Sequence, residues 1–445
     1  MNMKTHACNR RKFLNGATVM AGAIGWMGGA APLAQGATAQ TRPISDAALK
    51  KAIARVCQLA LNLPRIDTHS HFGLDVGNGV TALPAHGPVW DLAQHRNVAE
   101  GIRGLYGVDV GPLYRADGPP QAQTRARALR AAGARKAIEN ALDTENIATQ
   151  LAFCGAEPKW ATLQKEMAPR VRLLAYIDDL ITGSHNTFCP DRPWGTFDYY
   201  GLLSAQIQPL DTFDDLLRGI DARIDSWRSH GVVGMKTSIA YTIGLEVTDP
   251  TLDEARAAFA RKRSMTRSDA TTVMHAAFRH AVLACLRNKL PLVVHTGFQI
   301  WGKADLRQSN PMLLHNIISD PRYKDLHFVL LHGGNPYVGE TTYLAYAFSN
   351  VTIDFTWISW MSRSRFRQAL REWLEVVPHD RICWGSDSST PETIVGNGRN
   401  TRAEIAGVLA EMLGERMIDE RGAQDFLEAC YQTTPARVFG LSAPG

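Results

Sequence analysis

Short apolar runs alternate along this chain with longer amphipathic stretches, and this alternation limits the possible folds more than any other feature. Runs rich in Val, Ile and Leu are typical of parallel strands buried on both faces. The predicted strands are Arg65–His69, Ala148–Cys154, Val171–Ile177, Val232–Lys236, Leu292–His295, Phe328–His332, Val351–Phe355 and Ile382–Trp384. The stretches between them read as helices, for example Phe213–Trp227, Ala270–Lys289 and Arg363–Val376. Eight such units predict an α/β fold, a closed (β/α)8 or TIM barrel.

Two segments fall outside this pattern. Ser45–Leu61 reads as an N-terminal helix with Ser45 as its cap, within a helical extension (residues 40–63) that precedes a barrel domain of residues 64–445. Gly73–Pro120 is rich in Gly and Pro and follows the first strand. We therefore expect a long loop insertion that lies over the mouth of the barrel as a partial lid.

The start of the chain reads as an export signal. Asn9–Leu14 resembles a twin-arginine motif, a Gly- and Ala-rich apolar stretch follows, and Ala37–Ala39 offers small residues for cleavage. Residues 1–39 are therefore predicted to be a signal peptide that is recognised by the twin-arginine export machinery. The mature protein is expected to be periplasmic or secreted, without a stable membrane anchor. The alternative, a membrane-spanning anchor, is disfavoured because the stretch is Gly-rich and short for a bilayer.

Charge and motifs exclude several classes of protein. The net charge is +5, but residues 1–39 carry four basic residues and no acid, so the remainder carries only +1. A nearly neutral body does not predict a nucleic-acid partner. The sequence contains no G-x-x-x-x-G-K-[ST], G-x-G-x-x-G or G-x-S-x-G motif, which argues against nucleotide binding and a serine hydrolase. A small-molecule substrate is expected, and a homo-oligomer is possible.

Metal-ligand side chains recur where the predicted strands end. The first strand ends in His69-Ser70-His71, and residues i and i+2 of a strand point to the same side, so both imidazoles could share one divalent ion. The fifth, sixth and eighth strands lead into His295, His332 and Asp387. Each feature alone is compatible with a structural His or a capping Asp, but their order along a barrel predicts a metal site. His and carboxylate ligands suit Zn²⁺ first, with manganese or iron as alternatives.

With these residues the chain resembles the amidohydrolase superfamily, from about Pro64 to the C-terminus. Further motifs are similar to its amidohydrolase-related (amidohydrolase 2) branch, which includes the amidohydrolase-like domain fused to glutamine synthetase-like proteins. These motifs are Gly234–Tyr241, His295–Phe298, Asn310-Pro311, Leu331–Gly333, Pro336-Tyr337 and Thr434–Arg437.

The resemblance assigns roles to the five residues. His69 and His71 would be metal ligands, and Asp387 would be both a ligand and the catalytic base that takes a proton from water. His295 would be a further ligand or would orient the water, because the family contains both arrangements. His332 would act catalytically by polarising the substrate or holding the hydroxide.

Other residues near strand ends have more open roles. The resemblance implies that Lys236 either carries a carbamate that bridges two metal ions, or stays unmodified in a one-metal site and pairs with an acid or binds substrate. Tyr241, Trp357, Trp360 and Arg363 are candidate substrate contacts, by stacking or by a guanidinium clamp. Alternatively, the tryptophans pack under a loop and Arg363 lies on a solvated helix start.

These residues are compatible with four hypotheses for the function of the protein. The leading one is metal-dependent hydrolysis of an amide, lactone or similar bond by activated water. The second is metal-dependent non-oxidative decarboxylation of an aromatic or unsaturated acid, which the resemblance also allows. The third is isomerisation of a sugar acid. The fourth is a binding or scaffold protein on a barrel without catalysis. Sequence alone does not identify the substrate, because barrel specificity resides in the loops.

Overall fold

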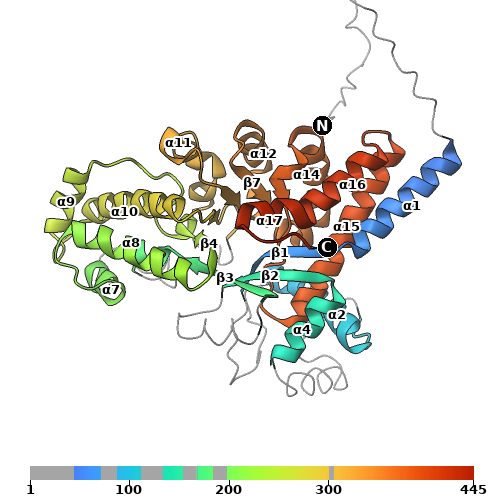
Figure 1. The fold of residues 1–445 in the computed structure, drawn as a ribbon, viewed down its shortest axis with the longest axis horizontal. Coiled ribbons are helices and arrows are strands. Elements are labelled where there is room, and N and C mark those ends of the chain that lie inside the picture. Colours follow the sequence, from blue (N-terminus) through green and yellow to red (C-terminus); the bar gives the residue numbers. More distant parts are fainter. Residues whose placement is uncertain are drawn as a thin grey trace, which may run out of the picture. The chain divides into compact units, whose positions relative to one another are not determined.

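Eight parallel strands form one sheet in which each strand pairs with its neighbour in the sequence, in the order β1 to β8 (Figure 1). The computed structural model describes residues 45–71, 88–111, 134–153, 167, 169–183, 198–299 and 305–444. The strands are β1 (Arg65–Ser70), β2 (Ile147–Phe153), β3 (Val171–Tyr176), β4 (Val232–Thr237), β5 (Leu292–Val294), β6 (Phe328–Leu330), β7 (Val351–Asp354) and β8 (Ile382–Cys383). β8 returns to β1: Ser70 bridges Ser388, and the backbone N–H of Asp387 donates to the carbonyl of His69 at 2.7 Å. The predicted (β/α)8 barrel is confirmed.

Five strands, β3, β5, β6, β7 and β8, end earlier than the sequence suggested. His295, His332 and Trp384 were expected inside strands, but each lies just beyond the ladder. His332 has a φ of 67°, which is incompatible with an extended strand. The backbone therefore turns where the chemistry-bearing side chains are placed. Cys154, expected to end the second strand, lies outside the described residues.

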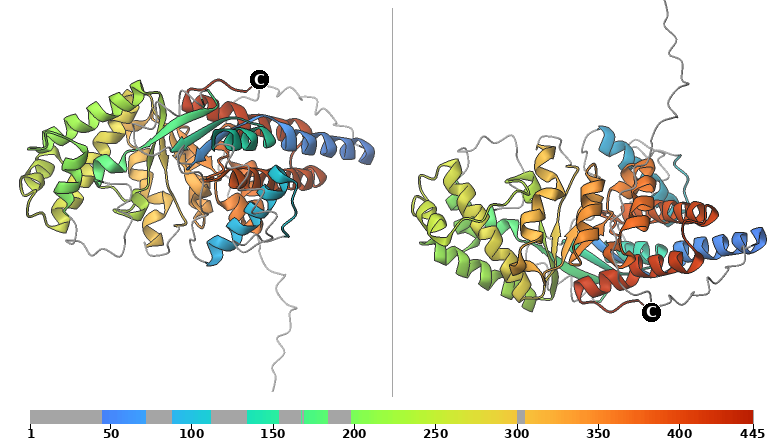
Figure 2. Two further views of the ribbon diagram at one scale, coloured as in Figure 1. Left: turned by 90° about the horizontal axis from the view of Figure 1, so that it is seen from below. Right: turned by 90° about the horizontal axis from the view of Figure 1, so that it is seen from above.

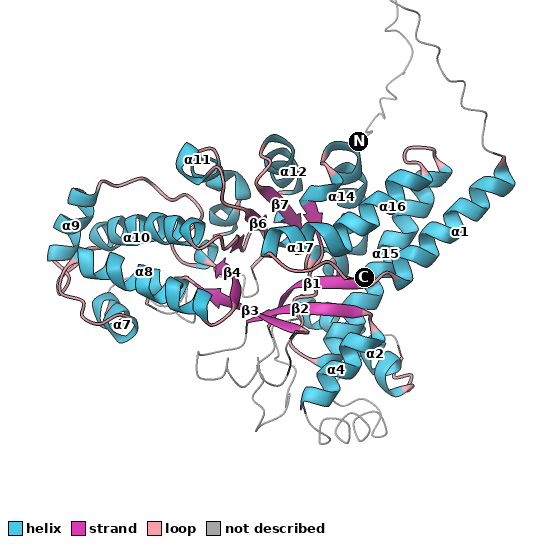
Figure 3. Cartoon of the chain, in the orientation of Figure 1, coloured by secondary structure: helices cyan, strands magenta, loops and turns pink. Residues whose placement is uncertain are grey.

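Helices cover the outer face of the sheet (Figure 2, Figure 3). Those before β5 are α1 (Asp46–Asn62), α2 (Pro88–Tyr106), α4 (Ala134–Thr144), α6 (Asp178–Ile181), α7 (Tyr199–Gln206), α8 (Phe213–Ser229), α9 (Leu252–Ala260) and α10 (Arg267–Arg287). Those after β5 are α11 (His315–Ile318), α12 (Val338–Ala347), α13 (Ile358–Met361), α14 (Arg363–Val376), α15 (Pro391–Gly414), α16 (Glu420–Glu428) and α17 (Thr434–Phe439). The three helices named from the sequence are confirmed as α8, α10 and α14.

Side chains fill the interior of the barrel, so it is a packed core and not a pore. A cluster of inward-facing apolar residues includes Leu174, Val233 and Val293 from successive strands. Val438 and Phe439 of α17 join this cluster, and a side chain added at Gly234 would meet the Phe439 ring. The C-terminal helix α17 thus contributes to the barrel core. The carboxyl ends of the strands are left to form the site.

The N-terminal helix is confirmed as α1. The Ser45 hydroxyl accepts a hydrogen bond from the backbone N–H of Ala48 at 3.3 Å, as expected of a cap. α1 lies along α15 and α16 (Figure 2), and Arg55 is paired with Glu420 at 2.6 Å. Buried Arg402 of α15 donates a hydrogen bond to the carbonyl of Leu61. This bond satisfies one of the backbone acceptors at the C-terminal end of α1. α1 is therefore an integral part of the folded unit.

The segment after β1 is not only loop, contrary to our expectation. Its residues 88–106 form α2, which packs closely on α15. A Cβ at Gly101 would lie 1.9 Å from the carbonyl oxygen of Glu392, and one at Gly396 would lie 1.8 Å from that of Asn97. The absence of side chains at these two glycines lets the helices cross in contact. Residues 73–87 and 112–120 of the insertion lie outside the described part of the chain, so the lid stays a prediction.

Among the helices built from described residues, none combines the length and apolar content that crossing a bilayer requires.

Gly101→Ala should lower the free energy of unfolding by about 1–3 kcal/mol, because the methyl group forces α2 away from α15. The matched control is Gly339→Ala on α12, where an added Cβ meets nothing within 4 Å. That change should be neutral or stabilising by up to about 1 kcal/mol. Denaturant titration of both variants checks this, and equal stabilities would contradict the close crossing.

Candidate metal centre

Three predicted ligands converge at the carboxyl end of the barrel. The Nε2 atoms of His69 and His71 are 3.1 Å apart, and each lies 3.3 Å from Oδ1 of Asp387. His69 and Asp387 are buried, whereas His71 is about one third exposed. Within the part of the chain that the structure describes, these three residues are the group with metal-ligand spacing. His71 is thus the member of the triad that solvent reaches.

The three ligand atoms fit a divalent ion. Two ligands that bind zinc tetrahedrally at about 2.0–2.1 Å lie about 3.3–3.4 Å apart. The observed separations of 3.1–3.3 Å between the three ligand atoms are close to that distance. Burial, with the nearby charge of Lys236, holds the pKa of His69 well below its usual value, so its ring is neutral with a free lone pair. A carboxylate and two neutral imidazoles are a donor set that zinc accepts.

The carboxylate of Asp67 holds this geometry together. It accepts hydrogen bonds from Ser386 N at 2.7 Å, Ser386 Oγ at 2.5 Å and Gln150 Nε2 at 2.6 Å. Asp67 lies two residues before His69, and Ser386 lies directly before Asp387. One buried side chain therefore ties β1 to β2 and to the turn after β8, and sets the distance between the ligands.

His295 and His332 form a separate hydrogen-bonded pair. His332 Nε2 lies 2.9 Å from His295 Nδ1, and His295 Nε2 lies 2.7 Å from the carbonyl oxygen of Phe298. Because a carbonyl can only accept, Nε2 of His295 carries the proton and Nδ1 accepts from His332. Both ring nitrogens of His295 are thus engaged, and the structure does not bring this predicted ligand into the triad. Burial lowers the pKa of both rings well below the usual value, so both are neutral.

Lys236 is buried on β4 in the middle of this constellation. Desolvation lowers its pKa to about 8, against the opposing effect of Asp387, Asp178 and Asp354. Its charge in turn lowers the pKa of His295 and His332. A group that titrates near neutrality among carboxylates is unusual for a purely structural lysine.

Two acidic residues were missed in the sequence. Asp178, just after β3, accepts hydrogen bonds from Ser238 N at 2.9 Å and Thr237 Oγ1 at 3.1 Å and so anchors the end of β4. Asp354, the last residue of β7, accepts from Thr68 Oγ1 and from Thr356 N at 2.8 Å. The signal that singled out Asp387, an acid at a strand end, would have found both.

The aromatic candidates divide into two groups. Tyr241 and Trp357 lie at the site, with ring centroids 4.5 and 5.4 Å from that of His295. Trp360 is buried beside Trp357. Arg363 does not reach the site, because its exposed guanidinium bonds Asn400 at 3.0 Å and lies 3.5 Å from Glu404 on α15.

Two further aromatic rings were not anticipated. Phe153, at the end of β2, stacks on His71 with centroids 5.0 Å apart and planes 25° apart. Tyr176, at the end of β3, lies 4.6 Å from Phe153. Their positions at strand ends were visible in the sequence, but ordinary core packing explained them equally well.

The backbone is unusual at three site residues. His332, Trp357 and Asp387 have φ values of 67°, 65° and 48°. Positive φ is costly for residues other than glycine and tends to occur where function requires a particular side-chain direction. The cluster coincides with the carboxyl ends of β6, β7 and β8, as expected of an active site.

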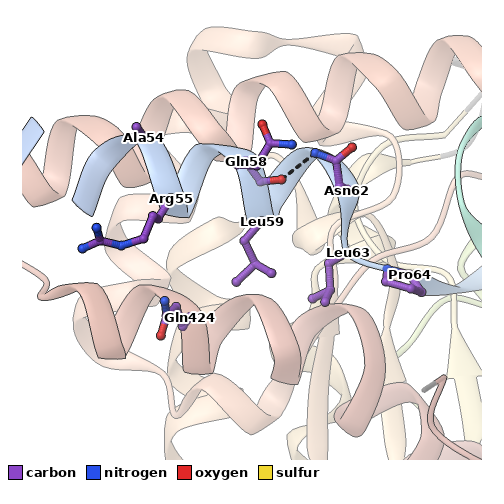
Figure 4. A pocket seen from close by; sticks show the side chains of 8 residues that line it. All are labelled: Ala54, Arg55, Gln58, Leu59, Asn62, Leu63, Pro64 and Gln424. Atoms are coloured by element: carbon purple, nitrogen blue, oxygen red, sulfur yellow. Dashed lines mark hydrogen bonds between the residues drawn. The ribbon is translucent and has the colours of Figure 1, made fainter. Parts of the chain in front are cut away.

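A hollow of about 700 Å³ lies between α1 and α16 and is shown in Figure 4. Its lining is Ala54, Arg55, Gln58, Leu59, Asn62, Leu63, Pro64 and Gln424. The lining contains no acid, histidine or cysteine, and its one charged residue is bound to Glu420. We therefore place the chemistry at the strand ends.

The barrel and its His–His–Asp triad are features of metal-dependent barrel enzymes, and comparison with known sequences identifies the family. A sequence model of the amidohydrolase family matches residues 212–441, more than half of the chain. The chain belongs to the amidohydrolase family, and the resemblance expected from its motifs is confirmed. It is 31% identical over 224 residues to Protein fluG of Emericella nidulans. That match spans 46% of this chain but only a quarter of the relative's length.

Solved structures show the same fold at low identity. A presumed metal-dependent hydrolase from Lactobacillus casei has a TM-score of 0.66 at 20% identity, with 86% of this chain and 97% of that chain covered. Uronate isomerase from Thermotoga maritima has a TM-score of 0.66 at 13% identity, covering 87% and 97%. Glucuronate isomerase from Caulobacter crescentus has a TM-score of 0.65 at 14% identity, covering 90% and 96%. At these identities the likeness shows the fold alone.

Asp67→Asn should weaken zinc binding about 10–100-fold, because an amide nitrogen would then face donors that need an acceptor. Competition with a chromogenic chelator measures the dissociation constant. Asp253→Asn, at a highly exposed carboxylate on α9, serves as the control. Unchanged zinc affinity in Asp67→Asn would contradict the role of the Asp67 carboxylate in setting the distance between the ligands.

Proposed function

We propose that this protein is a metal-dependent hydrolase that cleaves an amide, lactone or similar bond with activated water. The observation that carries the proposal is the convergence of His69 Nε2, His71 Nε2 and Asp387 Oδ1 within 3.1–3.3 Å of one another. They meet at the carboxyl ends of the strands, where barrel enzymes place their chemistry. The family membership supports the same class of activity.

Each residue of the site would have its own role in hydrolysis. A divalent ion held by the triad supplies Lewis acidity, which makes a water acidic enough to ionise near pH 7. Asp387 accepts the proton of the attacking water and later returns it to the leaving group. Burial raises the pKa of the Asp387 carboxyl, and His71, Lys236 and Trp357 oppose the rise. Neutral His332, whose Nε2 bonds His295, would accept a hydrogen bond from the reacting water at Nδ1.

We further propose that the site holds one ion, with zinc as the first choice. Asp387, Asp178 and Asp354 favour the charged form of Lys236 electrostatically, which supports an unmodified ammonium group. The His295 ring is engaged by His332 and Phe298, which leaves three protein ligands in the triad. A site with three protein ligands and a remaining open position is the usual arrangement of catalytic zinc.

Decarboxylation of an aromatic acid and isomerisation of a sugar acid are the competing activities. Phe153, Tyr176 and Tyr241 would suit a flat ring, and decarboxylation could use the same ligands. Hydrolysis consumes water and labels the product with ¹⁸O from the solvent. Decarboxylation releases CO₂, and isomerisation changes neither mass nor charge, so one product analysis separates the three.

Elemental analysis of the purified protein tests the number of ions. About one zinc per chain should be found in wild type and in Lys236→Ala, because the lysine does not hold the ion. About two per chain in wild type, falling on mutation, would contradict the one-ion site and indicate a carbamate bridge. No bound divalent metal, and none taken up on addition, would refute the proposed hydrolase.

Asp387→Asn should lower hydrolysis about 10²–10⁴-fold or more, because it removes both a ligand and the proton acceptor. A panel of amides, esters and lactones with chromogenic leaving groups provides the assay. Circular dichroism shows whether the fold survives, and Asp253→Asn is the surface control. Retained turnover in folded Asp387→Asn would reject the assignment.

Export by the twin-arginine route is also a proposal, and it rests on the sequence of residues 1–39 alone. Fractionation of cells that express the full chain, compared with Arg10→Lys/Arg11→Lys, tests it. The wild-type protein should accumulate in the periplasm or the medium, and the double variant should stay in the cytoplasm. The same distribution for both would reject this route.

A further inference from the structure

A side chain of α15 contacts the turn that carries Asp387. Asn397 is completely buried, and its Nδ2 lies 2.9 Å from the carbonyl oxygen of Ser386 and 3.3 Å from Oγ of Ser388. Because a carbonyl can only accept, the amide nitrogen faces it and donates, and its second hydrogen is left for the serine hydroxyl. Asn397 therefore contacts the residues on both sides of Asp387.

The peptide group between Ser386 and Asp387 is held at both of its polar atoms. Its carbonyl oxygen accepts from Asn397 at 2.9 Å, and its N–H donates to the carbonyl of His69 at 2.7 Å. Asp387 has a φ of 48°, a left-handed conformation that residues other than glycine avoid. Rotation of the peptide plane would relieve this strain and would break both hydrogen bonds. The bond from Asn397 thus opposes the movement that the backbone itself favours.

The contact with Ser388 extends this support to the second histidine of the triad. The carbonyl of Ser388 accepts a hydrogen bond from the backbone N–H of His71 at 2.9 Å, and Ser388 bridges Ser70 in the sheet. The peptide that precedes Asp387 is bonded to His69 in the same way. Through its two serine neighbours, Asn397 therefore acts on the backbone that holds all three members of the triad together.

Asn397 can hold the turn because α15 is itself fixed at this point. A Cβ added at the preceding Gly396 would lie 1.8 Å from the carbonyl oxygen of Asn97, so α2 lies directly against the helix there. Nδ2 of Asn400 also donates to Oδ1 of Asn97 at 2.6 Å. Asn397 therefore reaches the turn from a helix that cannot easily move away from it.

We propose that Asn397 is a positioning residue that holds the Ser386–Asp387 peptide in the orientation in which Asp387 meets His69 and His71. This inference rests on the proposed function, because it takes Asp387 as a metal ligand. If the peptide rotated, the Asp387 carboxylate would lose its 3.3 Å spacing to the two imidazoles. Groups that orient ligands without touching the ion commonly set metal affinity.

Two substitutions remove the donated hydrogen bonds. Asn397→Leu keeps a branched side chain without the amide, and Asn397→Ala removes the amide without adding bulk. The matched controls are Asn350→Leu and Asn350→Ala. Asn350 is also buried, and its Nδ2 donates to the carbonyls of Leu326 at 3.0 Å and Tyr323 at 3.4 Å, but it precedes β7 at the end of the strand opposite the site. Circular dichroism and thermal unfolding establish which variants fold, and Asn397→Ala alone decides the proposal if Asn397→Leu does not fold.

Two measurements report on the turn, one with metal and one without. Zinc affinity, measured by chelator competition, should fall about 10-fold or more in the Asn397 variants, and the visible spectrum of the Co²⁺-loaded protein should change. Deuterium uptake of the metal-free protein, followed by mass spectrometry in peptides that cover residues 385–390, should become about 3–10-fold faster, because the turn loses a hydrogen bond. The Asn350 variants should match wild type in both measurements.

Wild-type zinc affinity, or wild-type exchange of residues 385–390, in a folded Asn397 variant would overturn the positioning role while the hydrolase proposal stands. Equal effects in the Asn350 variants would also overturn it, because general loss of packing would then explain them. A folded wild-type protein that binds no zinc would refute the proposed function. In that case the exchange measurement still decides whether Asn397 holds the turn: faster exchange would support this hold, and unchanged exchange would overturn it.

Discussion

The hydrogen bonds of the Asp67 carboxylate are the interaction on which the site depends. This side chain accepts from Ser386 and Gln150 and so links three strands at the point where the barrel closes. Burial raises the pKa of Asp67 to about 6, and the donors around it oppose that rise. A buried acceptor surrounded by donors has little freedom to move, because any displacement leaves a donor unsatisfied. The same contacts that close the sheet thus fix the spacing of His69 and Asp387.

Charge balance is the second constraint on this site. Asp178, Asp354 and Asp387 are buried, and Lys236 is the cation that acts on all three. Burial raises the pKa of Asp354 and Asp387, and the Lys236 ammonium group opposes the rise at Asp387. A divalent cation beside Asp387 would favour the ionised carboxylates. The site therefore suits a bound metal ion on electrostatic as well as geometric grounds.

Neighbouring side chains position the reactive groups throughout the site. His295 holds His332, Trp357 stacks on His332, and Asp354 anchors the turn that carries Trp357. The positive φ angles at His332, Trp357 and Asp387 add a conformational cost that the packed barrel must offset. Rigid strands supply that support, since their residues lie in a densely packed core.

The sequence by itself determined the barrel, because eight apolar runs alternating with amphipathic stretches leave few other folds, and it identified the ligand types because strand ends meet at one face. It also predicted α1 from its cap. Only the tertiary structure decided that His295 pairs with His332 and stays outside the group of His69, His71 and Asp387, since that depends on distances between strands far apart in sequence. It likewise decided that Trp357 packs on His332, that Arg363 turns to α15, and that α2 forms within the supposed loop. Such outcomes depend on which neighbour completes each side chain's contacts, and no local pattern contains that information.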